Sequence, residues 1–569
     1  MVVELLAALT ALVPMPKEVV VTDGSSARGT NEIAAAVRGY VCDPSIPAEG
    51  YRLTVDGAGV SVRASTPAGA FYAGETLRQL ADGRGRLPYV RIADAPAFSW
   101  RGLHLDVARH FFGKAEVLRF LETMAAFKLN VLHWHLTDDQ GWRIPIPGYP
   151  ALTAAVRPVE NRKNFRDLSR SGTYGPFAYT REDLVEIVRR ASELHIRIVP
   201  EIEIPGHSRL LLKACPEFRC AVGERKADNA ACVGKEATIR FFEKVLDEVC
   251  SIFPGEVVHI GGDECNRSDW KRCPDCQARM DREGIKDVAG LQSWTTAHFE
   301  RYLASKGRRL MGWDEIAEGG LPPSAMVMSW RGTSTGVRAA RNGHDVVMCP
   351  NEFCYFDYEQ CVEDDPVPYA IDWTVPVPWA KTYAFDPLKG LPASCRRHVL
   401  GAQGNSWTEK TCTEADLQWK VWPRAAALAE VLWSYPPVRD PREFAGRLRV
   451  RRAALVSAGV NAAPVDLHTG VRPRGELVRR TVDGAERLEY ACGKTKAELC
   501  IADGDLVLTV NGERARTFKR DGGFCGLDVL QLDDGAHLVT CRRRGREIVA
   551  VVLFDGEKVV AKDRWDGDE

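Results

Sequence analysis

The sequence predicts a protein of the α/β class whose main domain is a (β/α)8 barrel, also called a TIM barrel. Between residues 101 and 435, short apolar strands alternate with amphipathic helices, and this unit repeats eight times. Polar, charged and aromatic side chains, of the kinds that form binding and catalytic sites, follow nearly every predicted strand. Repeated strand–helix units favour a closed parallel sheet, whose functional residues lie at the C-terminal ends of its strands. We expect a small α/β domain before the barrel and a small β-rich domain after it.

The domain before the barrel is assigned to residues 1–98. Two stretches, 51–55 and 60–64, alternate in hydrophobicity around a glycine-containing turn and are expected to pair as strands. A helix over 68–81 and a strand over 90–92 follow. We see no residues for chemistry in this domain.

The barrel is assigned to residues 99–462. Its predicted strands are apolar runs too brief for helices: 102–107, 130–136, 197–203, 257–262, 309–312, 325–329, 345–349 and 399–403. Helices are expected where apolar residues recur three and four apart: 114–127, 181–194, 236–253, 288–306 and 414–433. The Pro- and Trp-rich run 361–397 is expected to form irregular loops.

The last domain, residues 463–569, contains strand-like alternations separated by Asp-Gly and Asn-Gly turns, which predict a small β-rich domain. It is either a carbohydrate-binding module or a domain that only packs against the rest. We favour packing, because the sequence shows no clustered exposed aromatic residues.

Charge and composition exclude several classes of protein. A formal net charge of -1, with acids and bases interspersed, gives no field that would attract nucleic acid or an anionic membrane. The apolar residues 1–13 contain Glu4, lack a basic start and are too short to span a bilayer. They are interpreted as the remnant of a secretion signal, or as a first strand or helix. We expect no membrane span and a periplasmic or secreted location, with the cytoplasm left open, and a monomer or homodimer.

The 17 cysteines are many for a cytosolic enzyme, and their odd number leaves at least one unpaired within the chain. Cys273-Pro-Asp-Cys276 has zinc-knuckle spacing, but no second such pair stands nearby, so a disulfide or free thiols are favoured over structural zinc. Cys220 and Cys232 are predicted to form a disulfide if the protein is exported.

The first candidate for chemistry is the pair Asp263 and Glu264, directly after the predicted strand 257–262. Neighbouring carboxylates repel each other, and near an apolar wall their pKa values move apart, as acid–base chemistry requires. Taken alone, the pair is explained equally well by two solvated acids at a strand end. The other strand ends therefore decide between the two interpretations.

Other strand ends also carry functional residue types: Asp106, Arg109, His133, His135, Asp138, Asp139, Glu201, Glu203, His207, Trp313, Asp314, Trp330, Tyr355, Asp357, Trp407 and Glu409. Each has an ordinary structural explanation, but so many at one rim indicate a site. The three Trp side chains can stack on the faces of a pyranose, and the arginine and carboxylates can bind its hydroxyls. Carbohydrate is therefore the predicted substrate class. A metal site formed by His133, His135, Asp138 and Asp139 is the less favoured alternative, because these oxygen-rich neighbours lack a facing ligand triad.

Residues 99–435 resemble glycoside hydrolase family 20, the β-N-acetylhexosaminidases. The resemblance rests on motifs that occur in the family's order: Arg101-Gly-Leu-His-Leu-Asp-Val-Ala-Arg109-His, His133-Trp-His-Leu-Thr-Asp-Asp139, Pro205-Gly-His207-Ser, His259-Ile-Gly-Gly-Asp-Glu264, Gly312-Trp-Asp-Glu315, Ser329-Trp330-Arg-Gly, Tyr355-Phe-Asp357 and Gln403-Gly-Asn-Ser-Trp-Thr-Glu409. Residues 14–98 are similar to the small domain that precedes the barrel in that family. The stretch 270–292 is most similar to bacterial members.

The resemblance implies a role for each matching residue. Glu264 matches the general acid/base, Asp263 the residue that orients the substrate's 2-acetamido group, and Tyr355 the residue that holds the acetamido oxygen. The pocket walls correspond to Trp313, Trp330 and Trp407. The residues that bind sugar hydroxyls correspond to Arg109, Asp357 and Glu409, and the partners of the acid to Asp138 and His207. Either Asp138 or Asp139 can point inward, and the family assignment favours the first.

The resemblance implies an exo-acting enzyme that removes terminal non-reducing β-linked N-acetylglucosamine or N-acetylgalactosamine from glycans, without metal or organic cofactor. Adjacent carboxylates cannot readily flank a sugar ring from opposite faces, so a protein nucleophile is hard to assign. The resemblance implies instead that the substrate's own acetamido oxygen attacks C1. This is a substrate-assisted mechanism with retention of configuration. The alternatives are a catalytically silent sugar-binding protein and a family member that releases a disaccharide or a sulfated sugar.

Overall fold

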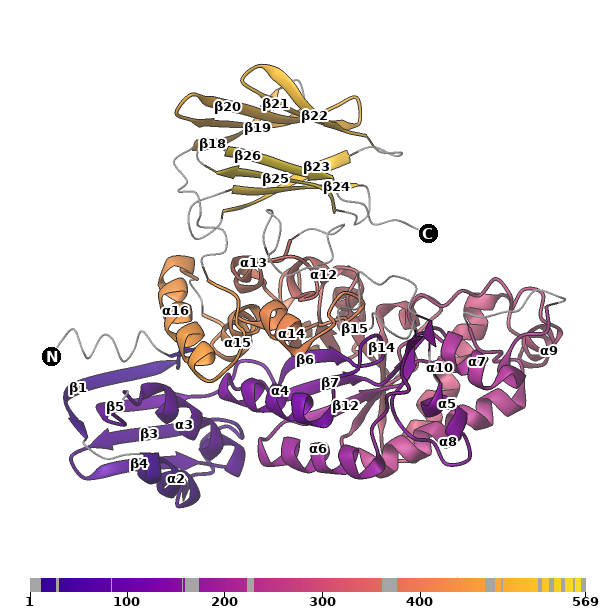
Figure 1. Cartoon of the computed structure of the whole chain (residues 1–569), viewed down its shortest axis with the longest axis horizontal. Coiled ribbons are helices and arrows are strands. Elements are labelled where there is room, and N and C mark those ends of the chain that lie inside the picture. Colours follow the sequence, from indigo (N-terminus) through magenta and orange to yellow (C-terminus); the bar gives the residue numbers. More distant parts are fainter. Residues whose placement is uncertain are drawn as a thin grey trace.

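The computed structural model describes residues 12–26, 30–82, 84–155, 157–158, 173–222, 230–360, 376–436, 439–465, 476–482, 485–519, 524–531, 537–543, 548–555 and 558–563. At its centre lies a closed barrel of parallel strands (Figure 1). In order around the barrel these are β12 (Arg197–Glu201), β13 (Val257–His259), β14 (Arg309–Trp313), β15 (Met326–Ser329), β16 (Val346–Met348), β17 (Val399–Gly404), β6 (Trp100–Asp106) and β7 (Val131–His135). The prediction of a (β/α)8 barrel is confirmed, strand by strand.

Four predicted helices are present and each ends one residue before its predicted end: α4 (Lys114–Ala126), α6 (Arg181–Glu193), α8 (Glu236–Ile252) and α10 (Val288–Ser305). Side-chain caps mark the starts of α4, α6 and α10. At α6, for example, the Thr180 hydroxyl accepts a hydrogen bond from the backbone of Asp183, whose side chain accepts one in return. This reciprocal cap satisfies two backbone groups that a helix start otherwise leaves without partners.

The prediction of one helix over 414–433 is wrong. The chain forms α14 (Glu414–Val421) and α15 (Arg424–Trp433), and Pro423 lies between them. Proline has no N–H to donate and its ring clashes with the preceding turn, so a helix rarely continues through it.

Irregular loops were predicted over 361–397, of which 361–375 lie outside the described residues. The prediction is wrong for α13 (Trp379–Ala384). This short helix buries Trp379 and Tyr383, and the Tyr383 ring stacks on Phe444 of α16 (Pro441–Ser457) at 4.3 Å between ring centroids. Burial of these aromatic side chains stabilises a helix that the local sequence does not predict.

The N-terminal domain contains a sheet in the order β1-β5-β3-β4-β2, built from β1 (Glu18–Ser26), β2 (Val41–Cys42), β3 (Tyr51–Asp56), β4 (Gly59–Ala64) and β5 (Leu87–Asp94). Helices α2 (Thr30–Arg38) and α3 (Pro67–Leu80) accompany it. The predicted hairpin is present, because β3 and β4 pair antiparallel up to Asp56 and Gly59.

Buried charges join this domain to the barrel. Both terminal nitrogens of Arg101 lie 2.9 Å from carboxylate oxygens of Glu49. Lys128 Nζ lies 3.2 Å from Asp94 Oδ2, which also accepts a hydrogen bond from Trp433 Nε1. The Arg101 and Lys128 side chains are almost fully buried, so these partners offset the cost of removing the two cations from water.

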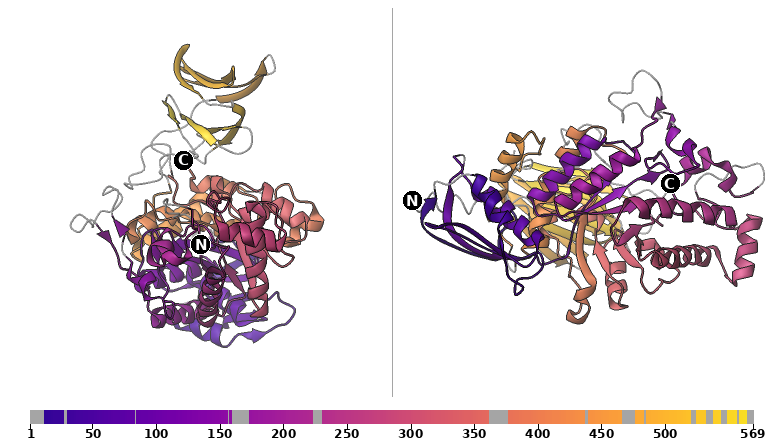
Figure 2. Two further views of the ribbon diagram at one scale, coloured as in Figure 1. Left: turned by 90° about the vertical axis from the view of Figure 1, so that its right-hand side faces the viewer. Right: turned by 90° about the horizontal axis from the view of Figure 1, so that it is seen from below.

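The C-terminal domain has two sheets, as the prediction of a β-rich domain requires. One contains β18 (Glu476–Val482), β19 (Ala485–Cys492), β20 (Thr495–Ala502), β21 (Asp505–Val510) and β22 (Glu513–Phe518); the other contains β23 (Phe524–Gln531), β24 (His537–Arg543), β25 (Ile548–Asp555) and β26 (Lys558–Asp563). Leu488, Leu499 and Phe554 belong to one apolar core that both sheets share. This core is separate from that of the barrel. In Figure 1 the sheets stand above α12 and α13, and the left view of Figure 2 likewise shows them above the rest of the molecule.

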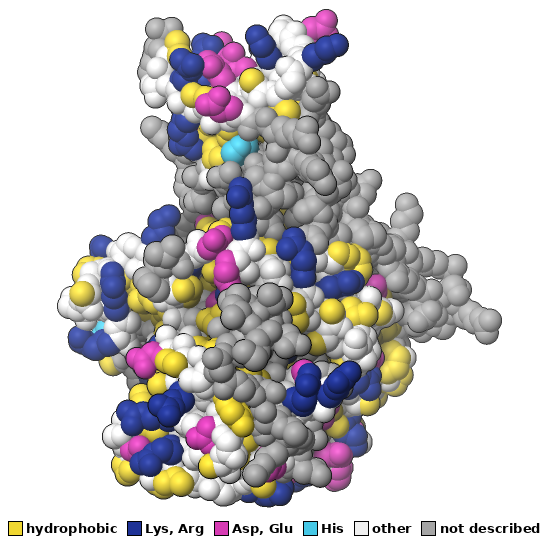
Figure 3. All heavy atoms as spheres, turned by 90° about the vertical axis from the view of Figure 1, so that its left-hand side faces the viewer, with side chains coloured by type: hydrophobic (Ala, Val, Ile, Leu, Met, Phe, Trp, Pro, Cys, Tyr) yellow, Lys and Arg dark blue, Asp and Glu magenta, His cyan; other side chains and the backbone are white. Residues whose placement is uncertain are grey.

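The predicted disulfide between Cys220 and Cys232 is not formed: both are free thiols, as are the other cysteines whose side chains the structure describes. Among the described residues, no helix is long and apolar enough to cross a membrane. On the face shown in Figure 3, Lys and Arg side chains stand singly or in small groups, with Asp and Glu among them.

Candidate active site

The predicted site residues meet at the C-terminal ends of the barrel strands. Helices α7 (Arg209–Ala214) and α9 (Pro274–Glu283) follow β12 and β13 and lie at the end of the molecule opposite the N-terminal domain (Figures 1 and 2). Asp263 and Glu264 directly follow a tight turn after β13 in which Gly261 and Gly262 have positive φ. At Gly261 the left-handed φ of 65° favours glycine, and a Cβ atom there would also overlap the carboxyl of Glu203.

His207 contacts both members of the acid pair. Its Nε2 lies 3.5 Å from Asp263 Oδ2 and 3.6 Å from Glu264 Oε2. Because one imidazole nitrogen reaches both carboxyls, Asp263 and Glu264 lie on the same side of the site. Burial opposes a charge on His207, but Asp138 and Asp263 outweigh it and raise the pKa of His207 well above its ordinary value.

The two carboxyls of the pair differ in environment. The Asp263 side chain is 11% exposed, whereas the Glu264 side chain is 61% exposed at the mouth of the site. Protein on the remaining sides of Glu264 still removes part of its hydration, and this desolvation, followed by the negative charge of Asp263, raises the pKa of Glu264. A carboxyl with a raised pKa can donate a proton near neutral pH.

Side chains of alternating charge extend from His207 into the interior of the barrel. Asp138 Oδ1 lies 3.3 Å from His207 Nδ1, and its Oδ2 lies 2.7 Å from His135 Nε2 and 2.9 Å from Arg109 Nη2. His135 Nδ1 in turn lies 2.6 Å from Glu201 Oε2. Burial alone would raise the pKa of Asp138, but Arg109 and His207 hold it well below the ordinary value, so Asp138 is ionised.

The structure distinguishes the two candidate aspartates after β7. Asp138 points into the network just described, whereas Asp139 Oδ1 accepts a hydrogen bond from the backbone N–H of Arg209, the first residue of α7. Asp138 belongs to the small hairpin of β8 (Thr137–Asp138) and β9 (Gly141–Trp142), and Asp139 follows in its turn. Asp139 Oδ2 also lies 3.8 Å from His207 Nδ1, farther away than Asp138 Oδ1.

The four residues of the metal alternative do not form one group of ligands. His133 faces Glu201 and Gln403 in the barrel interior, at 3.0 and 2.9 Å. Asp139 instead caps α7. Burial is the main cause that lowers the pKa of His133 to about 4, so this imidazole is neutral at neutral pH.

Aromatic side chains from separate strand ends wall the site. The rings of Trp313 and Trp407 lie 5.7 Å apart, and Trp330 stacks on Tyr355 at 6.1 Å with 19° between the ring planes. Hydrogen bonds fix two of the indoles: Trp313 Nε1 donates to Glu201 and Trp330 Nε1 to Glu315, at 2.7 and 3.0 Å.

Three of the predicted residues carry buried oxygen atoms that have no partner among the residues that the structure describes. Asp263 Oδ1, Asp357 Oδ1 and Glu409 Oε2 are buried and accept no hydrogen bond from the described residues. Asp357 is 4% exposed, and its burial, followed by the charge of Glu409, raises its pKa to about 8. Buried polar atoms usually have partners, so buried oxygens without partners on residues at one rim of the barrel are typical of a site for a polar ligand.

Sequence reasoning assigned no role to three residues that the structure places in this network. Glu201 holds the histidines and Trp313, Glu315 holds Trp330, and Glu203 lies against Gly261. Burial, followed by Asp263, raises the pKa of Glu203 well above its ordinary value. Glu201 and Glu203 alternate on one strand and its extension, and this period-2 spacing was the signal that could have placed both inside the barrel.

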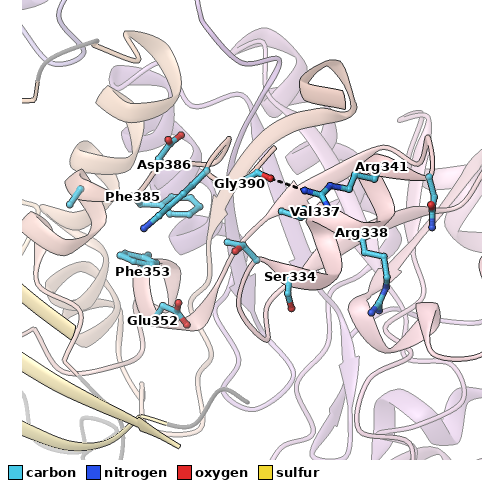
Figure 4. A pocket seen from close by; sticks show the side chains of 13 residues that line it. Ser334, Val337, Arg338, Arg341, Glu352, Phe353, Phe385, Asp386 and Gly390 are labelled. Atoms are coloured by element: carbon cyan, nitrogen blue, oxygen red, sulfur yellow. Dashed lines mark hydrogen bonds between the residues drawn. The ribbon is translucent and has the colours of Figure 1, made fainter. Parts of the chain in front are cut away.

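A second concavity lies away from these residues. It has a volume of about 740 Å³ and is formed by α11 (Ser334–Arg341), α12 (Asn351–Cys354) and residues 384–390 (Figure 4). Arg338, Arg341, Glu352 and Asp386 line it, but none of the predicted site residues does. It contains neither an adjacent acid pair nor a tryptophan wall.

Comparison with known proteins places the chain in a family. Residues 98–436 match the model of the glycosyl hydrolase family 20 catalytic domain, and residues 14–95 match the model of domain 2 of that family. A β-hexosaminidase of Porphyromonas gingivalis is 41% identical over 73% of this chain, which spans 54% of the length of that relative. A β-hexosaminidase of Akkermansia muciniphila is 33% identical over 73% of this chain and 85% of its own length.

Among solved structures, the exo-β-N-acetylglucosaminidase of Vibrio harveyi in complex with N-acetylglucosamine superposes with a TM-score of 0.74 at 30% identity. The similarity covers 80% of this chain and 79% of that one. The matched family models cover both the small N-terminal domain and the complete barrel that carries the acid pair. This chain therefore belongs to glycosyl hydrolase family 20.

Proposed function

We propose that this chain is an exo-β-N-acetylhexosaminidase that removes terminal non-reducing β-linked N-acetylglucosamine or N-acetylgalactosamine from glycans. The observation that carries the proposal is the position of Asp263 and Glu264 on one side of a tryptophan-walled site, both within 3.6 Å of His207. A retaining glycosidase with a protein nucleophile needs carboxyls on both sides of the scissile bond, about 5 Å apart. The nucleophile is therefore assigned to the substrate's own 2-acetamido group.

In this mechanism Glu264 is the general acid/base. Its raised pKa favours the protonated form needed to protonate the leaving oxygen, after which the carboxylate activates water. His207 and Asp138 tune this carboxyl, because the cationic imidazole lies between Glu264 and the ionised Asp138. Arg109 shares Asp138 with the two histidines and keeps it ionised.

Asp263 and Tyr355 are assigned to the acetamido group. As the acetamido oxygen attacks C1, positive charge develops on the acetamido nitrogen and carbon, and a buried carboxylate beside it stabilises that charge. Asp263 Oδ1 accepts no hydrogen bond from the described residues and is assigned to the acetamido N–H. The phenol of Tyr355 is assigned to the oxygen of the same group, which it holds beneath the ring.

The walls favour release of single sugars. Trp313, Trp330 and Trp407 come from the ends of three different strands and enclose one ring, while Asp357 and Glu409 offer unpartnered oxygens for its hydroxyls. We infer that walls from three separate strands leave no groove for an internal unit of a chain. The proposed chemistry uses protein side chains and the substrate alone, without a cofactor.

The test is hydrolysis of aryl N-acetyl-β-glucosaminide and galactosaminide, with the anomer of the first product read by NMR. We expect β-configured product, and almost no turnover of the aryl glucoside that lacks the acetamido group. Inverted product, or a sugar ester trapped on a protein carboxylate, contradicts the mechanism.

Two further outcomes identify the alternatives. Binding of N-acetylglucosamine without turnover of any substrate would show a silent sugar-binding protein. Release of a disaccharide or a sulfated sugar from defined oligosaccharides would show a different specificity on the same barrel. The periplasmic or secreted location and the monomeric or dimeric state stay predictions, which cell fractionation and light scattering test.

A further inference from the structure

Four cysteines from two loops meet in the protein interior. Cys220 and Cys232 lie in the long connection between β12 and α8, and Cys273 and Cys276 lie at the start of α9, after β13. Three of the four are fully buried and Cys220 is 6% exposed. All four are free thiols, and their sulfur atoms lie within 4.8 Å of one another.

Three of the six distances between the sulfur atoms match the edges of a metal-centred tetrahedron, and the other three are no longer than 4.8 Å. Cys232 Sγ lies 3.5 Å from Cys273 Sγ and 3.6 Å from Cys276 Sγ, and Cys220 Sγ lies 3.8 Å from Cys276 Sγ. A Zn–S bond of about 2.3 Å in a regular tetrahedron places the sulfurs about 3.8 Å apart. An ion at the centre would therefore reach all four sulfurs with little movement of the chain.

The same distances argue against two disulfides. A disulfide brings one pair of sulfurs to about 2.05 Å and leaves the pairs separate. Here Cys232 is nearly equidistant from Cys273 and Cys276, and no pairing is singled out. Four thiolates without an oxygen ligand exclude magnesium and calcium and favour zinc.

We propose that Cys220, Cys232, Cys273 and Cys276 bind one structural Zn²⁺ ion that fastens the loop after β12 to the loop after β13. Closed sites of four cysteines are a common structural form of zinc binding, and Cys273 and Cys276 have the usual spacing of one ligand pair. The other pair is separated by eleven residues, which is why the sequence alone did not indicate a site.

The surroundings suit a thiolate-bound ion. Cys273 is the N-terminal cap of α9, and Cys276 lies in its first turn. Four thiolates and one Zn²⁺ carry a net negative charge, which the positive end of a helix stabilises. A Cβ atom on Gly234 would overlap the backbone of Asp275 and Cys276, so the first loop lies directly against the start of α9.

The proposed site is connected to the active site by short hydrogen-bonded steps. The backbone N–H of Ala231, beside Cys232, donates to the carbonyl of Pro205 at 2.9 Å, and His207 follows two residues later. Trp270 Nε1, on the other loop, donates to the carbonyl of Ala231 at 3.2 Å. The ion would thus hold together the two loops that carry His207 and the acid pair.

The first experiment measures metal in the wild-type protein, purified under reducing conditions without chelator. We expect about one zinc ion per chain by elemental mass spectrometry. X-ray absorption spectroscopy at the zinc edge should show four sulfur neighbours at about 2.3 Å. Neither readout depends on enzyme activity, so failure of the proposed function leaves this test intact. Nitrogen or oxygen neighbours, or iron in place of zinc, would overturn the proposal.

The second experiment uses Cys273→Ser and Cys276→Ser, with Cys42→Ser as the matched control. Cys42 is exposed on the N-terminal domain, so its variant should keep the zinc and the melting temperature of the wild type. The two cluster variants should bind little or no zinc and melt at lower temperature. If they do not fold, a mercurial thiol reagent applied to the wild-type protein should release one zinc as four thiols react.

Two results would contradict the site directly. One is wild-type protein from zinc-supplemented medium that contains no zinc and takes none up after reduction. The other is a pair of disulfides among these four cysteines, found by peptide mass spectrometry in protein kept reduced throughout purification.

Discussion

The buried carboxyl of Asp357 lowers the stability of the free protein. Its pKa is raised to about 8, whereas an aspartate in the unfolded chain titrates near 3.8. Between these values the folded protein holds a proton that the unfolded chain has released, so the free energy of unfolding falls as pH rises from about 4 to 8.

Asp357→Asn should remove this dependence. The free energy of unfolding of the variant should rise relative to that of the wild type as pH rises, by as much as a few kcal/mol near pH 8. Its kcat/KM should fall, because the amide binds the sugar less well. Thermal melts at pH 5 and pH 8 measure the effect. Asp56→Asn, in the exposed turn between β3 and β4, is the control, and it should keep the pH dependence of the wild type. A melting difference that does not vary with pH would contradict the role given to Asp357.

Asp263 offers a test at the reacting centre. Asp263→Asn keeps the shape of the side chain and removes the charge that is proposed to stabilise the transition state. Loss of one such interaction typically lowers kcat by a factor of about 10²–10³. We expect a fall of that size with little change in the affinity for N-acetylglucosamine, measured by steady-state kinetics and calorimetry. Asp269→Asn, at a surface ion pair with Arg272, should behave like the wild type. An unchanged kcat in Asp263→Asn excludes its assigned role.

At the scale of elements, the turn after β13 positions the acid pair. Gly261 and Gly307 have nearly the same φ, 65° and 70°, but only Gly261 has a neighbour that an added Cβ would overlap. Gly307→Ala should therefore cost only about 1 kcal/mol of left-handed strain. Gly261→Ala adds a clash with Glu203 and should lower kcat at least about 100-fold by displacing Asp263 and Glu264. Chemical denaturation and kinetics of both variants measure this, and equal behaviour of the two would contradict the argument.

The strands and their terminal residues could be predicted because each strand is a short apolar run followed by a polar or aromatic residue. Features that depend on contacts distant in the sequence could not. Trp379 and Tyr383 form a helix because they pack on α16, and Cys220 meets Cys276 across two loops. That Asp138 lies nearer His207 than Asp139 does is likewise a matter of contacts between residues distant in the sequence. Pro423 is different, since its local chemistry was enough to predict the break.

At the scale of the molecule, the C-terminal sheets have a core of their own, and none of the proposed site residues belongs to it. A chain that ends after Val465 should therefore keep the kinetic constants of the full protein on aryl substrates, within a factor of about 2. Steady-state kinetics and a melting curve of the shortened chain measure this. The segment 476–563 is expressed separately and measured alongside it. A tenfold loss of kcat/KM on small substrates would show that these sheets complete the site.

The charges buried between the N-terminal domain and the barrel have a further consequence. Without Glu49 and Asp94, Arg101 and Lys128 would stand as uncompensated cations in an apolar interior, so neither unit is a complete folding unit without the other. In a calorimeter they should melt as one transition, and the C-terminal sheets as another. In chimeras with other members of this family, residues 12–465 should therefore be kept together, and a different C-terminal domain should be joined after residue 465.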